Sequence, residues 1–335
     1  MVSRPPHDDR TSGSGRVARG FLDGLERWLA SDRSPDGPSA RAALLEVLRE
    51  AQAAQPSMAL VHQLAARALA VADTSVARGD RAADLRQFVL ESCAAERRDL
   101  EKAVADAART AAELITVREP WIATLSASEA VLAALKALAA TGRRPRVLIA
   151  ESRPRFEGRD TARALADAGI EAWLVADAAL PLLLSQAHAL WLGADAVTEF
   201  GVINKIGSWT AALAAREHGV PTWAIAVRRK LIPGATAALG IAEQPPAEIW
   251  DAAPEGVRPR NVYFEMVHAA LLRGVVVEDA VLGVTEIGVA ARDHRTHALA
   301  VDFFGGLFHL LGNPQLGEHL GREVSAAGAG RVGHR

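Results

Sequence analysis

The chain of 335 residues contains a single cysteine, Cys93, which excludes an intramolecular disulfide framework. A chain without disulfides suits a reducing compartment, and we expect a cytoplasmic protein. Residues 1–16 are polar and lack the apolar segment of a secretion signal. No apolar run reaches the roughly 18 residues that a membrane-spanning helix needs, so we predict no contact with a membrane.

An excess of charge of either sign is also missing. The chain has 38 Lys and Arg against 40 Asp and Glu, a formal net charge of -2. Such a balance gives no general attraction to nucleic acid, and we expect no nucleic-acid partner. The histidines, His62, His188 and His268 among them, show no metal-ligand spacing. We therefore predict no metal site.

The common cofactor and nucleophile motifs are absent as well. No G-x-G-x-x-G follows the first predicted strand, and the chain has neither G-x-x-x-x-G-K-[ST] nor G-x-S-x-G. These absences disfavour a dinucleotide-dependent dehydrogenase, a P-loop NTPase and an α/β-hydrolase. We predict that the protein holds no cofactor.

The first third of the chain has the pattern of helices. Residues 1–16 are rich in Pro, Gly and Ser, and we expect them to form a flexible tail or a phosphate-binding loop. From there to residue 118, apolar residues recur at helical spacing, as in VARGFLDGLERWLA. Pro38 suits the first turn of a helix that ends near Gln55. We predict a helical domain over residues 17–118.

After Pro120, short apolar runs alternate with segments of helix length. The runs span residues 121–125, 146–150, 172–176, 189–193 and 222–226. Strands that are apolar on both faces and alternate with helices form a parallel sheet covered on both sides. The predicted fold class is therefore α/β, with an N-terminal helical domain followed by a Rossmann-like parallel sheet with helices on both faces. We place this second domain at residues 119–300 and a C-terminal extension at 301–335.

Polar or charged side chains follow each of these runs. They are Ser126 and Ser128, then Glu151 to Arg153, then Asp177, then Asp195 with Asn204 and Lys205, and then Arg228 to Lys230. Ligands of open parallel sheets bind beyond the carboxyl ends of the strands. Lysine and arginine neutralise phosphate, and Asn and Asp bind hydroxyl groups. The pattern predicts a pocket for a small polyanion that carries hydroxyls.

Structural roles remain open for each of these residues. Asp195 can cap the segment after its strand, and Asn204 can cap a helix. Lys205 can be a solvated surface charge. Glu157 with Gly158 is first of all typical of a turn before a helix, and Ser126 is typical of a turn or a cap.

Two stretches carry a family resemblance. ESRPRFEGRDTARALADAGI and the later GADAVTEFGVINKIGS resemble a superfamily of three groups. These are the ribose-1,5-bisphosphate isomerases, the methylthioribose-1-phosphate isomerases and the regulatory subunits of translation initiation factor 2B. The resemblance covers about residues 120–275, and the helical part more loosely. It implies a helical domain on a Rossmann-like domain, in agreement with the pattern above.

The resemblance also implies roles for individual residues. Asp195 would move a proton of the substrate, and Arg153, Asn204, Lys205 and Lys230 would hold a sugar phosphate. Ser128 is a further predicted substrate-binding residue. The segment Ser12-Gly13-Ser14 matches the loop that receives a phosphate in the isomerases, where Arg-Gly-Ala is frequent, so the arginine is missing here. A disordered tail is the alternative for this segment.

The chain departs from the isomerases at one decisive position. Their first strand ends in T-H-C-x-[ST], and the Cys and the Asp of G-A-D form the acid/base pair. The matching residues here run from Thr124 to Ser128, with Ser126 at the Cys position. A thiol with a pKa of about 8.5 can be tuned toward neutrality, whereas a serine hydroxyl needs a strong base beside it. Ser126 is therefore a weak catalytic partner or a hydroxyl binder. In the later F-[DE]-x-T-P motif, Phe264 and Glu265 match but Met266 and Val267 replace Thr-Pro.

Two hypotheses follow. The first is an aldose–ketose isomerase for a phosphorylated pentose, of the ribose-1,5-bisphosphate or methylthioribose-1-phosphate type, with Asp195 and Ser126 as catalytic residues. The second is a non-catalytic initiation factor 2B-like subunit that senses a sugar phosphate or a nucleotide. A protein partner in translation initiation rests on the family name alone. The family often forms dimers, so we expect a homodimer.

Overall fold

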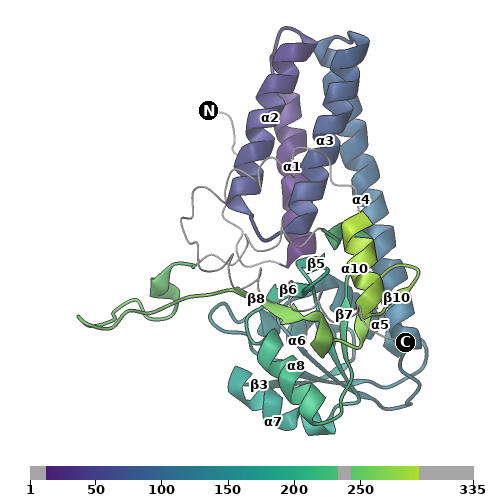
Figure 1. Cartoon of the computed structure of the whole chain (residues 1–335), viewed down its shortest axis with the longest axis vertical. Coiled ribbons are helices and arrows are strands. Elements are labelled where there is room, and N and C mark those ends of the chain that lie inside the picture. The colour runs from purple at the N-terminus through teal and green to yellow at the C-terminus, as the bar shows by residue number, and fades with distance from the viewer. Residues whose placement is uncertain (1–12, 233–242, 294–335) are drawn as a thin grey trace, which may run out of the picture.

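The computed structural model describes residues 13–232 and 243–293. Four long helices stand above a layered α/β body, and the fourth runs down beside the sheet (Figure 1). The sheet of this body is parallel except at one edge. The predicted fold class, a helical part followed by a Rossmann-like sheet, is confirmed.

The helical part consists of α1 (Ser14–Ser31), α2 (Gly37–Ala54), α3 (Ala59–Arg78) and α4 (Ala82–Glu113). Asp36 caps α2 by accepting a hydrogen bond from the Ser39 N–H at 2.8 Å. Gly79 ends α3 in the left-handed conformation, with φ of 76°. The four helices share an apolar core that includes Leu22, Leu44 and Leu85.

The start of α1 corrects one expectation. The helix begins at Ser14, inside the stretch that was expected to be flexible. Ser14 is only 4% exposed, because this helix end packs against the start of α5 (Glu129–Ala140). A Cβ atom on Gly15 would lie 2.1 Å from Glu129 Oε2. Packing against a distant element orders a segment whose composition is typical of a tail. The expectation for residues 1–12 lies outside the described residues.

Seven strands form the main sheet in the order β10-β9-β7-β4-β1-β2-β3. They are β1 (Trp121–Leu125), β2 (Arg146–Ala150), β3 (Glu171–Val175), β4 (Ala189–Leu192), β7 (Thr222–Ile225), β9 (Gly274–Val276) and β10 (Val281–Leu282). Only β10 pairs in the antiparallel direction. All five strands predicted from apolar runs are confirmed to within one residue at each end. β1 is central, between β4 and β2, so its carboxyl end lies between the carboxyl ends of these two strands.

Helices cover both faces of this sheet. One face packs against the end of α4, against α5 and against α6 (Glu157–Asp167). The other face carries α7 (Leu180–Leu183), α8 (Ser208–Glu217) and α10 (Val284–Asp293). The central strands are buried on both sides, which explains their continuous apolar sequences, whereas the edge strand β3 is partly exposed.

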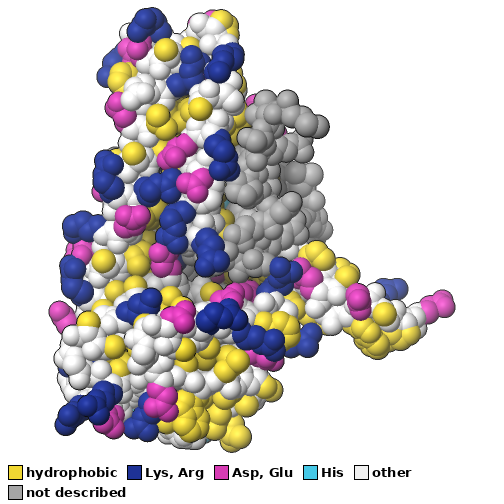
Figure 2. Space-filling view, turned by 180° about the vertical axis from the view of Figure 1, so that it is seen from behind, with side chains coloured by type: hydrophobic (Ala, Val, Ile, Leu, Met, Phe, Trp, Pro, Cys, Tyr) yellow, Lys and Arg dark blue, Asp and Glu magenta, His cyan; other side chains and the backbone are white. Residues whose placement is uncertain are grey.

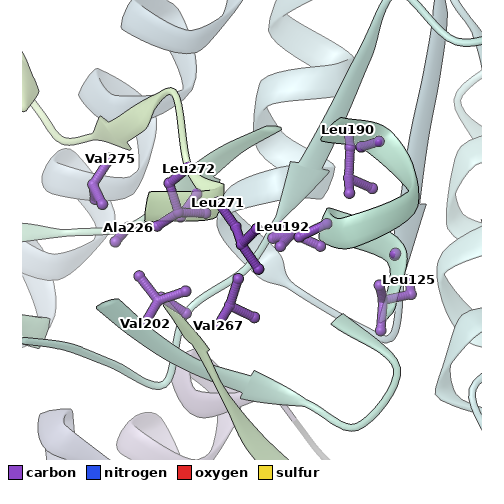
Figure 3. Packing of buried hydrophobic residues seen from close by; sticks show 14 of the residues in the cluster. Leu125, Leu190, Leu192, Val202, Ala226, Val267, Leu271, Leu272 and Val275 are labelled. Carbon is purple, nitrogen blue, oxygen red and sulfur yellow. The ribbon is translucent and has the colours of Figure 1, made fainter. Parts of the chain in front are cut away.

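A second, smaller sheet was not predicted. It has the order β5-β6-β8 and consists of β5 (Ala196–Thr198), β6 (Gly201–Lys205) and β8 (Phe264–His268). Val202 and Val267 of this sheet pack in one apolar cluster with Leu192 and Val275 of the main sheet (Figure 3). The stretch from Asp195 to Lys205 therefore folds back over the carboxyl edge of the main sheet and does not leave it as a loop.

An arm formed by residues 243–262 projects away from this body (Figures 1 and 2). Its base is closed by a bridge between Glu243 and Val262, and Ile249, Trp250 and Val257 are exposed beyond it. Within the described residues, no helix has the length and apolar character to cross a membrane.

Candidate functional site

The carboxyl edge of the sheet and the lower end of the helical part enclose one pocket. Eight of the sequence-predicted site residues line it, namely Gly13, Ser14, Ser126, Ser128, Asp195, Asn204, Lys205 and Lys230. They come from the start of α1, the turn after β1, the segment after β4, the end of β6 and the 3-10 turn η3 (Arg228–Lys230). The convergence follows from the strand order, because β1 and β4 are neighbours and the small sheet lies over their ends.

Asp195 lies deep in this pocket and is 7% exposed. Its backbone is fixed on both sides, since its N–H donates to the Ile203 carbonyl at 2.7 Å and its carbonyl accepts from the Ala59 N–H at 3.2 Å. Burial raises the pKa of the Asp195 carboxyl, while the charges of Lys230 and Lys205 and a hydrogen bond with Ser14 act in the opposite direction. A buried carboxyl of this kind is able to hold or release a proton at a reacting atom.

Lys230 is a second buried ionisable residue of the pocket, and its amine interacts electrostatically with the Asp195 carboxyl. Its Nζ donates to the Ala194 carbonyl at 2.6 Å, and the residue is 6% exposed. Burial lowers the pKa of Lys230, and the negative charges of Asp195 and Glu129 partly oppose this shift. Burial thus disfavours the charged form of both groups, while each group favours the charged form of the other.

Lys205 forms a buried ion pair with Glu157, the first residue of α6. The Lys205 Nζ lies 2.5 Å from Glu157 Oε1, and their side chains are 4% and 7% exposed. The same ammonium lies 4.5 Å from the centre of the Tyr263 ring. The Tyr263 hydroxyl in turn donates to Glu248 at the base of the arm. Lys205 is therefore held in place from two directions, and the expectation of a solvated surface charge is wrong.

Asn204 and Ser128 meet at Gly193. The Asn204 Nδ2 donates to Ser208 Oγ at 2.9 Å, which turns its Oδ1 toward Gly193. A Cβ atom on Gly193 would lie 2.7 Å from Ser128 Oγ and 3.3 Å from Asn204 Oδ1. The lack of a side chain at Gly193 thus lets two polar side chains reach the pocket floor. Ser128 also caps α5, accepting from the Val131 N–H at 3.4 Å.

Ser126 occupies a tight turn with a positive φ of 63°. Its N–H donates to Ser152 Oγ at 2.7 Å, and its carbonyl accepts from Thr161 Oγ1 at 2.8 Å. A non-glycine residue in this backbone region is uncommon and marks a turn that its surroundings hold in place. The turn places Ser126 on the pocket wall, where the isomerases of the resembled family carry cysteine.

Helix N-termini add uncharged groups that are able to bind an anion. The first turns of α1, α5 and α6 all line the pocket, through Gly13 to Gly15, Ser128 to Ala130, and Glu157. The backbone N–H groups of a helix N-terminus attract phosphate. A Cβ atom on Gly13 would lie 2.2 Å from the Ala127 carbonyl oxygen, so α1 and the turn after β1 approach each other closely. Glycine at this position makes the contact possible.

One described residue of the predicted set, Arg153, is not brought to this pocket. Ser12 lies outside the described residues. Arg153 is exposed and does not line the pocket; its guanidinium lies 5.4 Å from the centre of the Phe156 ring. Asp177 has a structural role, since its carboxylate accepts from the N–H groups of Ser152 at 2.7 Å and Arg153 at 2.8 Å. A role for Arg153 in ligand binding stays a prediction that this arrangement does not support.

The helical part contributes pocket residues that the sequence did not indicate. Met58, Leu60, Leu100 and Val104 of the helical part form one apolar wall, which Val227 and Phe264 of the α/β body complete. Arg19 of α1 lines the rim and pairs with Glu129 at 2.7 Å. Glu157 was also missed, although it stands in the ESRPRFEG motif. The position of Glu157 in this motif was the one signal in the sequence for a role in the site. The pair Glu157-Gly158 was interpreted as a turn before a helix, which is the simpler explanation.

The pocket thus has a charge-balanced polar floor. Asp195 and Glu157 supply two carboxyl groups, and Lys205 and Lys230 supply two amines. These groups can bind hydroxyls and phosphate and move protons. In the described part of the chain, no group of three His, Cys, Asp or Glu side chains is arranged to hold a metal ion.

A helical domain over the carboxyl edge of a Rossmann-like sheet, with buried Asp, Asn and Lys in the G-A-D and N-K motifs, defines a class of sugar-phosphate isomerases and related initiation-factor subunits. Residues 10–291 match the initiation factor 2 subunit family. The chain belongs to this family.

Individual relatives fall into both groups of this class. A translation initiation factor eIF-2B subunit 2-like protein of Pyrococcus furiosus is 30% identical over 257 residues, which is 76% of this chain and 86% of the relative. A ribose 1,5-bisphosphate isomerase of Archaeoglobus fulgidus is 34% identical over 158 residues, which is 45% of this chain and 50% of the enzyme. A methylthioribose-1-phosphate isomerase of Cronobacter sakazakii is 33% identical over 42% of this chain and 46% of the enzyme.

Solved structures give the same two groups. The translation initiation factor eIF-2B of Pyrococcus horikoshii OT3 superposes with a TM-score of 0.70 at 26% identity, over 84% of this chain and 94% of the other. The 5-methylthioribose 1-phosphate isomerase of the same organism reaches a TM-score of 0.66 at 18% identity, over 91% of this chain and 86% of that enzyme. This second likeness establishes the shared fold.

Proposed function

We propose that this protein binds a sugar phosphate and isomerises it from an aldose to a ketose. The substrate class is a phosphorylated pentose of the ribose-1,5-bisphosphate or methylthioribose-1-phosphate type. One observation carries the proposal: Asp195 is buried among Asn204, Lys205 and Lys230 in a single pocket. The relatives named as isomerases for these sugars support it, because their similarity to this chain covers 45% and 42% of its length.

Each part of the pocket has a role in this reaction. The N-termini of α1 and α5 and the amine of Lys230 bind the phosphate by charge and by backbone N–H groups. Asn204 and Ser128 bind sugar hydroxyls, since an amide and a hydroxyl can each donate and accept. Asp195 exchanges a proton with the sugar, and matched proton transfer accelerates such steps by roughly 100- to 10,000-fold. Ser126 is placed to bind a hydroxyl of the sugar.

A second function has its own support. Ser126 stands where the isomerases carry cysteine, and the eIF-2B-like relative matches 76% of this chain. A subunit that binds a sugar phosphate or a nucleotide without converting it is therefore the alternative. In either case we expect a homodimer in solution.

A binding and turnover screen tests both functions. Purified protein is mixed with ribose 1,5-bisphosphate, methylthioribose 1-phosphate, other phosphopentoses or nucleoside monophosphates. Thermal shift reports binding, and NMR of the sugar protons reports conversion. A ligand at about 100 times its Kd should stabilise the fold by about 2.7 kcal/mol, which is a measurable rise in Tm. The Asp195→Asn variant provides the matched test of the site.

The outcomes separate the two functions. Conversion to a ketose that Asp195→Asn abolishes establishes the isomerase. Binding without conversion assigns the sensor function. Conversion that Asp195→Asn leaves unchanged shows that the role given to Asp195 is wrong. If none of the phosphopentoses binds, the sugar-phosphate site itself is refuted.

A further inference from the structure

One oxygen atom in the pocket lacks a partner. Glu157 Oε1 is held by the Lys205 ammonium, but Glu157 Oε2 is buried and accepts no hydrogen bond from any described residue. A buried carboxylate oxygen without a donor is costly, so such an atom calls for an explanation. Because Glu157 lines the pocket, a donor on a bound ligand is a candidate partner for this oxygen.

The strand order places Glu157 opposite Asp195. Asp195 follows β4 and Glu157 follows β2, and β1 with its Ser126 turn lies between these strands. The two carboxyl groups therefore flank the residue that replaces the cysteine of the isomerases. They also interact electrostatically, since the negative charge of Glu157 contributes to the raised pKa of Asp195.

The local backbone fixes Glu157 in this position. Phe156, directly before it, adopts a left-handed conformation with φ of 60°. Gly158, directly after it, lies so close to β2 that a Cβ atom would be 1.9 Å from the Ala150 carbonyl oxygen. The carboxylate is thus held by its backbone on one side and by Lys205 on the other. A group held in this way is suited to proton transfer, because little rearrangement is needed.

We propose that Glu157 is the second proton-transfer group of this site and does the work for which the isomerases use cysteine. This inference rests on the proposed function. Glu157 Oε2 accepts the hydrogen bond of the C2 hydroxyl of the sugar and takes its proton. Asp195, on the opposite wall, gives a proton to the ring oxygen.

The reaction balances with these two groups alone. For a furanose 1-phosphate, the C1–O4 bond breaks as O4 takes the proton of Asp195. The C2 hydrogen moves to C1 with its electron pair, and the C2 hydroxyl gives its proton to Glu157. C2 is oxidised to a ketone and C1 is reduced to a methylene that carries the phosphate. The product is the open-chain 2-ketose 1-phosphate, and no external oxidant or reductant is needed.

The test is steady-state kinetics of Glu157→Gln, with ribose 1,5-bisphosphate and methylthioribose 1-phosphate as probes. We expect kcat to fall by at least about 100-fold, with KM within about threefold of the unchanged protein. The control is Glu151→Gln, which removes a carboxylate that pairs with Arg159 outside the pocket and should stay within about twofold. Ser126→Ala should cost no more than about tenfold, which is the scale of a lost hydrogen bond to a hydroxyl.

A second variant addresses folding, because Glu157→Gln leaves Lys205 without its buried counter-charge. Glu157→Asp keeps the charge but withdraws the carboxylate by one methylene, so kcat should fall by at least about tenfold. The proposal is overturned if Glu157→Asp retains full kcat, or if Ser126→Ala loses as much as Glu157→Gln. Wild-type protein that converts neither probe refutes the proposed reaction and this role with it. Conversion that is unaffected by both Glu157 variants refutes only the role of Glu157.

Discussion

Burial shifts the pKa values of single residues in the pocket away from their values in water. Burial shifts the pKa of Asp195 upward and the pKa of Lys230 downward, so both shifts favour the uncharged forms. Each group keeps the other from being an isolated buried charge. Sites with such opposed shifts are typical of binding and catalysis, whereas an ordinary core would use apolar side chains. The site thus has a cost in stability that a bound anion can reduce.

His62, which does not line the pocket, also has a pKa that is shifted by burial, and the effect can be measured as a pH dependence of stability. It lies on α3 with Nε2 3.2 Å from the Pro56 carbonyl, and burial lowers its pKa from 6.5 to about 4. The unfolded chain gains this proton at higher pH than the folded chain. The stability due to neutral His62 is therefore present above about pH 6.5 and is lost as pH falls toward about 4. The loss amounts to about 3 kcal/mol.

We predict that His62→Gln removes this share of the pH dependence. Urea unfolding of both proteins between pH 7 and pH 4 measures it, and the wild-type advantage should shrink by about 3 kcal/mol over this range. His218→Gln, at an exposed histidine, should leave the wild-type curve unchanged. Parallel curves for wild type and His62→Gln would show that His62 is not the group responsible.

At the scale of elements, local sequence was enough to predict most helices and five of the seven strands of the main sheet, but not β9 and β10. Four of the five apolar runs after Pro120 became strands in the interior of the sheet, where burial on both faces requires apolar side chains, and the fifth became the partly exposed edge strand β3. The predicted grouping of polar residues at strand ends follows from the same parallel topology. The order of runs and polar residues along the chain was therefore sufficient to place Asp195, Asn204 and Lys205 at one edge of the sheet.

The small sheet could not be predicted in the same way. β6 pairs with β8, and the paired residues are separated by the whole arm and several other elements. No local period reports a pairing over such a distance, and β5 has only three residues. The burial of Lys205 and its pairing with Glu157 depend on this sheet. The sequence pattern therefore indicated the residues of the site but not which of them touch.

Gly158 provides a test at this scale, where α6 begins against the end of β2. A Cβ atom at this position would meet the backbone of Ala150 at 1.9 Å and the Glu151 Cα at 3.0 Å. Because backbone atoms cannot move aside cheaply, we predict that Gly158→Ala lowers the free energy of unfolding by about 2–3 kcal/mol. It should also reduce turnover or binding, since Glu157 precedes this glycine.

Gly283→Ala is the matched control. A Cβ atom there would meet only the flexible Glu286 side chain, at 3.4 Å, so the change should stay within about 0.5 kcal/mol. Chemical unfolding of both variants gives the comparison. Equal stabilities would mean that the start of α6 is free to shift, and the fixed position of Glu157 would lose its support.

At the scale of the whole molecule, the site depends on how the helical part is joined to the sheet. The pocket draws residues from both, so a change at the joint alters the pocket. Val227 and Phe264 pack into the core of the helices. Beside them, Glu96 of α4 pairs with Arg67 of α3 at 2.5 Å and also with Arg229 of η3. Arg229 directly precedes Lys230, so this ion-pair network links the helical domain to the amine that we propose binds the ligand.

The last prediction concerns this network. Glu96 is 4% exposed, and Glu96→Gln leaves two guanidinium groups without their shared counter-charge. Breaking a fully buried pair costs roughly 3–5 kcal/mol, and the Arg67 side chain is 59% exposed, so we expect a loss of about 2 kcal/mol. Glu46→Gln, which removes an exposed pair with Arg49, should cost less than about 0.5 kcal/mol.

Ligand affinity shows whether the ion-pair network around Glu96 shapes the pocket or only stabilises the fold. If the network sets the position of Lys230, Glu96→Gln raises the Kd of whichever phosphopentose binds the wild type, at a temperature where the variant is fully folded. Titration calorimetry on both proteins measures this Kd. An unchanged Kd with a lowered Tm would mean that the helices hold the sheet together without adjusting its pocket. A raised Kd would show that contacts at Glu96, outside the pocket lining, set the geometry in which the ligand is bound.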